Sequence, residues 1–236
     1  MSFNLGQPPV GQPPYSPWKP NQLRIIERAI AAAWVQLMGQ PDFVNWAQTA
    51  VERDITVELQ KRLVYLLNTR EVRGFSAATF SAPIRGQEVE NYSGAEKEKR
   101  PDLTFNRLAA RPVTTHHAQF YECKILGRGR TLDDYHGDGV MRFVDGRYAW
   151  GMPHAGMIAY VSPPPSPLAE VVLADFWKWD KNSKPRRGLP TRDLALDTGP
   201  EPRVVISVHA RTFPLHDGAA PGEIVLRHLW LSTRPR

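Results

Sequence analysis

Three charged residues between positions 101 and 126 have the types and the spacing that chemistry would need. Glu122 and Lys124 lie in the middle of the apolar run FYECKIL, and Asp102 begins an earlier strand-like run, PDLTFNRLA. Residues two apart in a strand face the same side, so Glu122 and Lys124 share one face. An exposed ion pair contributes only about 0–1 kcal/mol, so stability alone is a weak reason to place this pair there. If the two strands are antiparallel neighbours, Asp102 comes near the pair, and two carboxylates then converge with one ammonium group.

Two carboxylates held close together repel each other unless a cation lies between them. Mg²⁺ suits this role because it accepts a few carboxylate ligands and keeps several waters. A lysine beside such an ion can position a water molecule or offset negative charge that develops on a phosphate. The three residues therefore predict a site that hydrolyses phosphodiester bonds.

The motif also resembles a known signature. Pro101-Asp102, nineteen intervening residues and then Glu122-Cys123-Lys124 are similar to the motif of the PD-(D/E)xK nuclease superfamily. The resemblance implies a restriction-endonuclease-like fold in which Asp102 and Glu122 are metal ligands, the carbonyl of Cys123 is a further ligand and Lys124 is the catalytic lysine. It implies Mg²⁺ as the cofactor, with Mn²⁺ as a substitute.

Many members of this superfamily supply one more acid from the first core helix. Glu52 and Glu58 lie on the two flanks of the apolar stripe that residues 44–68 form. Glu52 is the first choice for this ligand, and Glu58 is the second.

Four arginines that follow the motif are expected to bind nucleic acid, because arginine suits bidentate contact with phosphate oxygens. Arg128 and Arg130 lie in GRGR, directly after the motif strand, and Arg142 and Arg147 lie further on. The alternative for Arg142 and Arg147 is a solvated helix face. A basic stretch at 178–192, with Trp177 and Trp179 at its leading edge, is either a solubilising loop or a further nucleic-acid contact.

The elements that must position these residues follow from periodicity and turn signals. Helices are expected at 21–38 (with Asn21 as the N-cap), 44–68, 131–149 and 168–179, and PDF at 41–43 is expected to break the helical run. Strands are expected at 75–84, 101–109, 118–126, 155–161, 203–213 and 223–232. This order predicts an α/β (α+β) fold, with a restriction-endonuclease-like mixed central sheet flanked by helices and with extra C-terminal strands.

Composition and length limit the domain organisation. Residues 1–20, rich in Pro, Gly and Gln, predict a flexible arm. Residues 21–236 predict a single nuclease-like domain with a core at about 44–161 and a C-terminal elaboration at 162–236. The hydrophobic fraction of 42% indicates a folded core, and the formal net charge of +6 permits a polyanionic partner.

The same inspection excludes several classes. The single cysteine, Cys123, rules out an internal disulfide framework, and the seven histidines show no zinc-ligand spacing. No apolar run approaches the ~20 residues that span a bilayer, and the first residues lack the pattern of a secretory signal. We therefore expect a cytoplasmic protein with no membrane partner.

The leading hypothesis is a Mg²⁺-dependent DNA endonuclease, either a restriction enzyme or an effector of antiviral defence. A homodimer and a separately encoded sensor or regulatory protein are possible partners. The alternative is a catalytically silent member of the same fold that binds nucleic acid or serves in assembly. A third possibility is an α/β domain in which the motif is coincidental.

Overall fold

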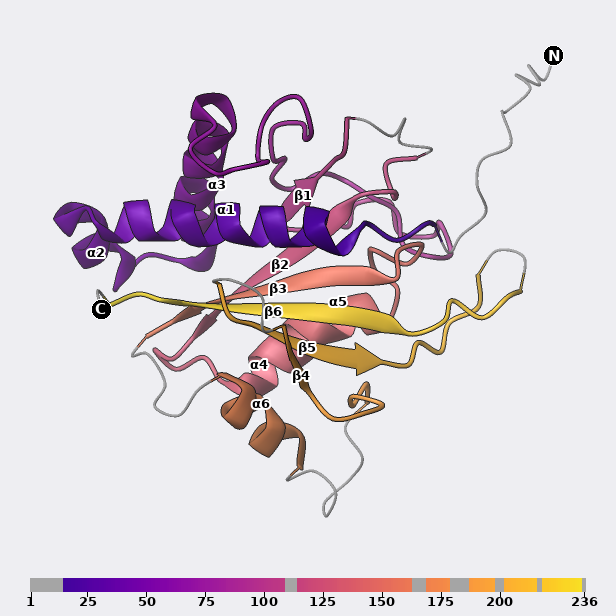
Figure 1. The fold of residues 1–236 in the computed structure, drawn as a ribbon. Helices are drawn as coiled ribbons and strands as arrows, with labels where there is room; N and C mark the ends of the chain where they lie inside the picture. Colours follow the sequence, from indigo (N-terminus) through magenta and orange to yellow (C-terminus); the bar gives the residue numbers. More distant parts are fainter. Residues whose placement is uncertain are drawn as a thin grey trace.

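A computed structural model describes residues 15–108, 114–162, 169–178, 187–197, 202–215 and 218–234 of the chain. These residues form a mixed α/β fold in which a six-stranded mixed sheet is flanked by helices (Figure 1). The strand order across the sheet is β1-β2-β3-β6-β5-β4. The coarse fold class expected from the sequence is confirmed.

The sheet combines a parallel centre with antiparallel edges. Its strands are β1 (Leu103–Phe105), β2 (Gln119–Leu126), β3 (His154–Val161), β4 (Ala195–Asp197), β5 (Val204–His209) and β6 (Ile224–Ser232). Strand β3 is parallel to both β2 and β6, whereas β1 pairs antiparallel with β2, and β5 pairs antiparallel with β6 and β4. Strands β2 and β3 are buried along nearly their whole length, as the long apolar runs in their sequences predict.

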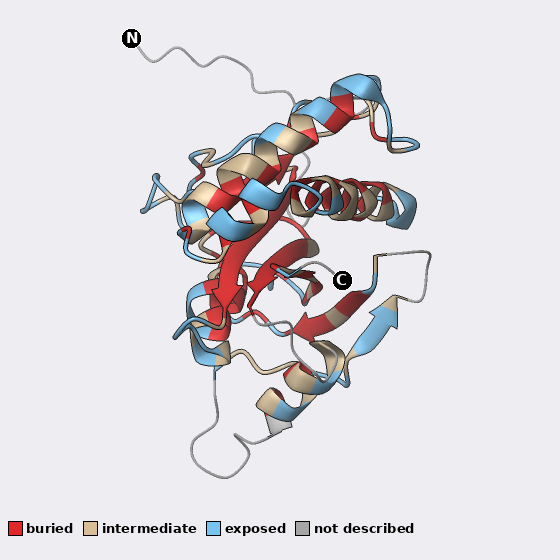
Figure 2. Ribbon diagram, turned by 90° about the vertical axis from the view of Figure 1, so that its left-hand side faces the viewer, coloured by how far each residue is buried: buried red, intermediate tan, exposed pale blue. Residues whose placement is uncertain are grey.

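Helices cover both faces of the sheet (Figure 2). They are α1 (Pro20–Met38), α2 (Pro41–Ala47), α3 (Glu52–Thr69), α4 (Leu132–Tyr135), a π-helical turn η1 (His136–Val140), α5 (Met141–Val144) and α6 (Ala169–Lys178). On one face, Tyr160 of β3 stacks on Trp34 of α1 and shares a hydrogen bond with Thr56 of α3. On the other face, His228 of β6 contacts Tyr135 at the end of α4. Within the described residues, none of the helices has both the length and the apolar character that crossing a membrane requires.

Several predicted boundaries are confirmed to within a few residues, and others are wrong. The expected break at 41–43 is instead the start of α2, because proline fits the first turn of a helix, where its missing N–H costs nothing. Helix α1 likewise begins at Pro20 with Lys19 as the N-cap, so Asn21 is not the cap. The helix expected at 44–68 is two helices, α2 and α3, separated by residues 48–51.

The strand expected at 75–84 is not formed. This segment makes only isolated bridges, Phe80 with Arg107 and Ile84 with Thr104. Its side chains still contribute to the core, because Phe75 and Phe80 are fully buried. Pro83 carries no N–H, so a continuous ladder could not pass through it.

The proline-rich arm expected at 1–20 is anchored from residue 15 onward. Tyr15 and Trp18 are buried, and the amide of Tyr15 donates to the carbonyl of Gly151 at 2.7 Å. Residues 1–14 lie outside the described part of the chain, as does most of the basic stretch at 178–192.

Candidate active site

Strand β1 is short, and part of one edge of β2 therefore has no neighbouring strand. Strand β1 pairs with β2 over three positions, from Leu103 opposite Tyr121 to Phe105 opposite Gln119. Continuing this register would place Pro101 opposite Cys123, but proline has no N–H to donate to the Cys123 carbonyl. The carbonyl of Pro101 instead accepts from Gly86 at 3.2 Å. The edge of β2 from Cys123 onward therefore needs other hydrogen-bond partners.

Side chains of the predicted site supply these partners. The amide of Cys123 donates to Oδ2 of Asp102 at 2.7 Å, and the amide of Ile125 donates to Oε2 of Glu52 at 3.0 Å. The carbonyl of Cys123 accepts from Nζ of Lys124 at 2.9 Å. Buried backbone groups are almost always paired, so these contacts satisfy the strand and at the same time fix both carboxylates in position.

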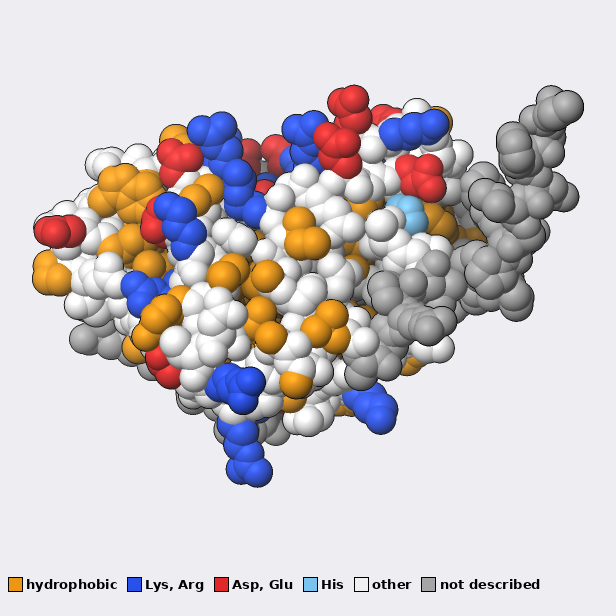
Figure 3. All heavy atoms as spheres, turned by 90° about the horizontal axis from the view of Figure 1, so that it is seen from above, with side chains coloured by type: hydrophobic (Ala, Val, Ile, Leu, Met, Phe, Trp, Pro, Cys, Tyr) orange, Lys and Arg blue, Asp and Glu red, His pale blue; other side chains and the backbone are white. Residues whose placement is uncertain are grey.

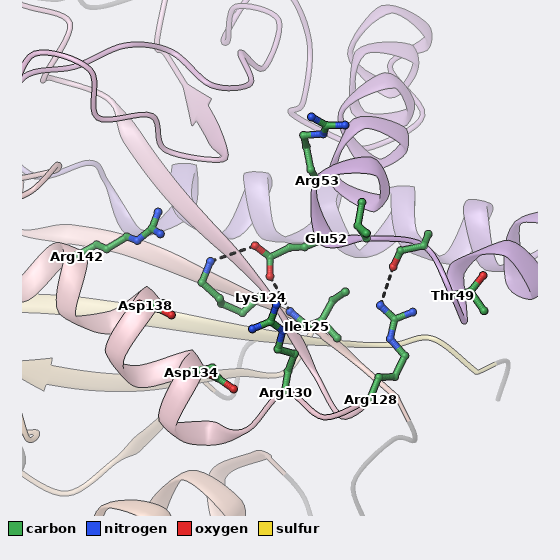
Figure 4. A pocket seen from close by; sticks show the side chains of 12 residues that line it. Thr49, Glu52, Arg53, Lys124, Ile125, Arg128, Arg130, Asp134, Asp138 and Arg142 are labelled. Carbon is green, nitrogen blue, oxygen red and sulfur yellow. Dashed lines mark hydrogen bonds and ion pairs between the residues drawn. The ribbon is translucent and has the colours of Figure 1, made fainter.

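The ammonium group of Lys124 lies at the centre of the cluster. Besides the Cys123 carbonyl, Nζ donates to Oε1 of Glu122 at 2.7 Å and to Oε1 of Glu52 at 3.1 Å. Figure 4 shows Glu52 reaching from the start of α3 toward Lys124 on β2. One cation thus contacts three of the four oxygen donors that the resemblance assigns to a metal ion.

Glu122 is buried and receives donors on both of its oxygens. It is 1% exposed, and its Oε1 also contacts Arg142 at 2.9 Å. Its Oε2 accepts from the hydroxyl of Tyr148. Arg142 lies on α5 and Tyr148 lies in the turn that follows, so the segment after η1 contacts both oxygens of Glu122.

The pKa values of the acids reflect their crowding. Burial and the charge of Asp102 raise the pKa of Glu122 to about 7, against the lowering effect of Lys124 and Arg142. Burial also raises the pKa of Asp102, although the Cys123 amide and Lys124 act in the other direction. Burial alone would lower the pKa of Lys124, but Glu122 and Glu52 outweigh it and raise that pKa. These shifts favour the protonated form of Lys124. They also show that the nearby positive charges do not fully offset the cost of burying the ionised Glu122 and Asp102 carboxylates.

A cleft of about 440 Å³ opens onto this cluster. Its wall includes Glu52 and Lys124 and four arginines, which are Arg53, Arg128, Arg130 and Arg142 (Figure 4). Arg53 and Arg130 are exposed, so their guanidinium groups face solvent at the rim. Two acids, Asp134 and Asp138, line the cleft as well, so its surface carries both signs of charge.

The four arginines expected to bind nucleic acid have different surroundings. Arg130 and Arg142 line the cleft. Arg128 also lines it, but its guanidinium donates to the main-chain carbonyls of Ala47, Gln48 and Ala50, which join α2 to α3. Arg147 does not line the cleft and lies 3.6 Å from the carboxylate of Asp145.

The geometry also distinguishes the two candidate helix acids. Glu52 contacts Lys124 and the β2 backbone, whereas Glu58 forms an ion pair with Lys61 at 2.7 Å and lines a separate hollow beside Phe43 and Tyr65. Of the two, only Glu52 lies in the cluster.

Sequence reasoning missed Arg53 and the site contact of Tyr148. Arg53 directly follows Glu52 at the start of α3, so its place beside the cleft could have been inferred once Glu52 was chosen. No local pattern indicates the Tyr148 contact with Glu122, because it joins two segments that are separated by α4, η1, α5 and a turn in which Gly146 has a φ of 70°.

Buried histidines form a separate polar network on the same face of the sheet. Both ring nitrogens of His228 form hydrogen bonds. Nδ1 lies 2.7 Å from the hydroxyl of Tyr135, and Nε2 lies 2.7 Å from the hydroxyl of Ser207. Burial lowers the pKa of His228 to about 3 and that of His209 to about 4. In the described part of the chain, no group of three or more His, Cys, Asp or Glu side chains is arranged to hold a metal ion.

Comparison with known protein families, with curated proteins and with solved structures found no match. The function of the site must therefore be argued from its own geometry.

Proposed function

We propose that this chain is a Mg²⁺-dependent endonuclease with a restriction-endonuclease-like fold and that it hydrolyses DNA phosphodiester bonds. The observation that carries the proposal is the gathering of three carboxylates at the open edge of β2: Glu122 and Glu52 contact Lys124, and Asp102 accepts from the amide of Cys123. A stability role does not explain the arrangement well, because a buried ion-pair network is weak evidence for stability.

The element order supports the proposed fold in part. A helix with an acid at its start precedes the antiparallel pair β1–β2, and a helical segment then leads to β3, parallel to β2. The first of the three expected core strands is represented only by the bridges of Phe80 and Ile84.

The described side chains are not arranged around a cation site, because Lys124 occupies the space between the acids, but their chemistry suits a divalent cation. Carboxylate and carbonyl oxygens are the ligands that Mg²⁺ prefers, and three such oxygens already converge on one ammonium group. Burial and, after it, the charge of Asp102 raise the pKa of Glu122, which indicates that a further positive charge there would stabilise the ionised carboxylate. Asp102, Glu122, Glu52 and the Cys123 carbonyl would hold the ion, and the ammonium of Lys124 would have to leave these oxygens.

The reaction is hydrolysis: a water oxygen forms a bond to phosphorus, the bond to one ester oxygen breaks, and that oxygen takes up a proton. The bound ion would supply charge neutralisation at the phosphate. Lys124, once released from the carboxylates, can donate to the attacking water or to a phosphate oxygen. Arg142 offers further N–H donors beside it, since only part of its guanidinium is used by Glu122 and Tyr148.

DNA is proposed as the substrate because of charge. The chain has a net charge of +6, and arginines lie on several sides of the cleft. The charge is not uniform over the molecule: the face that carries α1 and α3 mixes acidic and basic side chains (Figure 3). We assign the phosphate contacts to Arg53, Arg130 and Arg142 because these three arginines line the cleft that opens onto the cluster.

The test is a plasmid-nicking assay with the purified chain in Mg²⁺ or in EDTA. We expect cleavage only with Mg²⁺, and its loss in Glu122→Ala, Lys124→Ala and Glu52→Ala. Glu58→Ala is the matched control, because Glu58 lies on the same helix and outside the cluster. Cleavage that survives in the three site variants would show that the site is wrongly assigned, and DNA binding without cleavage would favour the catalytically silent module.

A further inference from the structure

The hydroxyl of Tyr148 makes a buried contact whose role the proposed mechanism leaves open. Tyr148 is 1% exposed, and its hydroxyl donates to Oε2 of Glu122, which is equally buried. Building on the proposed function, we propose that Tyr148 is a positioning residue that orients the Glu122 carboxylate for cation binding.

The division of donors between the two oxygens of Glu122 supports this role. Lys124 and Arg142 both contact Oε1, at 2.7 and 2.9 Å, whereas Oε2 accepts from Tyr148. The two cations hold only one of the two carboxylate oxygens. A donor on the opposite oxygen holds the second one and so fixes the plane of the carboxylate, and Arg142 lies 3.4 Å from the same hydroxyl.

Tyr148 is itself held by its surroundings. Its ring packs edge-on against Phe143, with ring centroids 5.1 Å apart. The turn that follows it is fixed by Arg211, whose guanidinium donates to the carbonyls of Trp150 at 3.0 Å and Met152 at 3.1 Å. Arg211, which follows β5, thus supports the segment that carries Tyr148.

Groups that hydrogen-bond a metal-ligating side chain typically change metal affinity about 10–100-fold when they are removed. The substitution Tyr148→Phe deletes one oxygen atom and keeps the packed ring. We therefore expect it to weaken cation binding without unfolding the chain.

The experiment measures Mn²⁺ affinity of the full chain by calorimetry and by electron paramagnetic resonance, with thermal unfolding recorded in parallel. Tyr148→Phe is expected to bind Mn²⁺ at least about tenfold more weakly than wild type. Tyr135→Phe is the matched control, because its buried hydroxyl contacts His228 and not Glu122. It is expected to bind Mn²⁺ as the wild type does.

Equal affinity in Tyr148→Phe and wild type, or an equal loss in both variants, overturns the inference. If the wild type binds no Mn²⁺, the inference and the proposed function both fail. If it binds Mn²⁺ but cuts no DNA, only the proposed function fails, and the Tyr148 comparison still decides the inference.

A second measurement covers the case in which Tyr148→Phe does not fold. In wild-type protein labelled at the tyrosine ring carbon that bears the hydroxyl, the signal of Tyr148 is expected to shift when Mg²⁺ is added, and that of Tyr135 is not. A Tyr148 signal that does not respond while Mg²⁺ binds overturns the inference.

Discussion

At the scale of single residues, the cluster brings acidic and basic side chains together, and the ammonium group of Lys124 occupies the place that a metal ion would take. Glu52 and Glu122 contact Lys124, and Glu122 also contacts Arg142. With Asp102, which accepts from the Cys123 amide, the cluster holds three acids and two bases. Lys124 contacts three oxygens that a divalent ion would also use. The same residue would therefore compete with the ion before it assists the reaction.

This competition gives the first prediction. Lys124→Met is expected to bind Mn²⁺ more tightly than wild type, by about tenfold if the change removes about 1.4 kcal/mol of competition, and to lose DNA cleavage. Binding is measured by calorimetry and cleavage by plasmid nicking. Lys61→Met is the control, because Lys61 pairs with Glu58 outside the cluster. Weaker Mn²⁺ binding in Lys124→Met than in wild type would contradict the competition.

The second prediction concerns pH. The pKa of Glu122 in the folded chain is about 7, above its ordinary value of 4.5, so the folded state holds this proton more tightly than the unfolded state. Its contribution to stability is present below pH 4.5 and is lost as pH rises through about 7. In EDTA, the free energy of unfolding of wild type relative to Glu122→Gln should fall by about 3 kcal/mol from pH 4 to pH 8.

Denaturant unfolding at a series of pH values measures this difference. Cation binding should show the opposite trend, because it needs the ionised carboxylate: Mn²⁺ affinity should rise with pH up to about 7 and then level off. A stability difference that does not change between pH 4 and pH 8 would show that folding does not raise the pKa of Glu122.

At the scale of elements, the site depends on where β1 and α2 end. Strand β1 begins only at Leu103, so Pro101 does not pair with Cys123. This leaves the edge of β2 open to Asp102 and Glu52. The turn after β2 then sends Arg128 to the link between α2 and α3. This turn requires Gly127, whose φ is 92° and where a Cβ would lie 1.7 Å from the carbonyl oxygen of Ser162.

A pair of arginine variants tests this division of roles. Arg128→Met should lower the free energy of unfolding by about 2 kcal/mol, since it removes charged hydrogen bonds to the carbonyls of Ala47, Gln48 and Ala50. Arg130→Met should leave stability within about 0.5 kcal/mol of wild type, because this exposed side chain lies at the cleft rim. Chemical denaturation measures both changes.

The same pair differs in DNA binding. Arg130→Met should reduce the slope of log affinity against log salt concentration by about 1, as expected for the loss of one phosphate contact. Fluorescence anisotropy with a labelled duplex at several salt concentrations gives this slope. An unchanged slope would remove Arg130 from the phosphate contacts.

At the scale of the whole molecule, the C-terminal part of the chain supports the site from a distance. Strand β6, near the C-terminus, lies beside β3 in the centre of the sheet. Arg211, after β5, is buried and donates to several main-chain carbonyls, including those of Ala149, Trp150 and Met152. Burial lowers the pKa of Arg211 to about 10, so its charge depends on these carbonyls for stabilisation.

Arg211→Met therefore gives a prediction for the molecule as a whole. Leaving several buried carbonyls without a donor should lower the free energy of unfolding by about 3 kcal/mol. Because the turn that follows Tyr148 loosens, Mn²⁺ affinity should fall together with stability. Thermal unfolding and calorimetry measure the two effects, and an unaltered melting temperature would show that the turn does not depend on Arg211.

The sequence by itself determined the coarse fold and the main residues of the cluster. Long apolar runs specify the buried strands β2 and β3, and the strand period places Glu122 and Lys124 on one face. The nearness of Asp102 also followed from expecting an antiparallel pair, and β1 and β2 form that pair. Such local signals suffice because alternation and chain order are properties of neighbouring residues.

Only the tertiary structure decided the remaining features. The choice of Glu52 over Glu58, the use of Arg128 for main-chain carbonyls and the approach of Tyr148 to Glu122 each join segments distant in the chain. The missing strand at 75–84 was decided in the same way, since its apolar side chains are buried without a ladder. No local pattern encodes such contacts, because they depend on how helices and turns pack over the sheet.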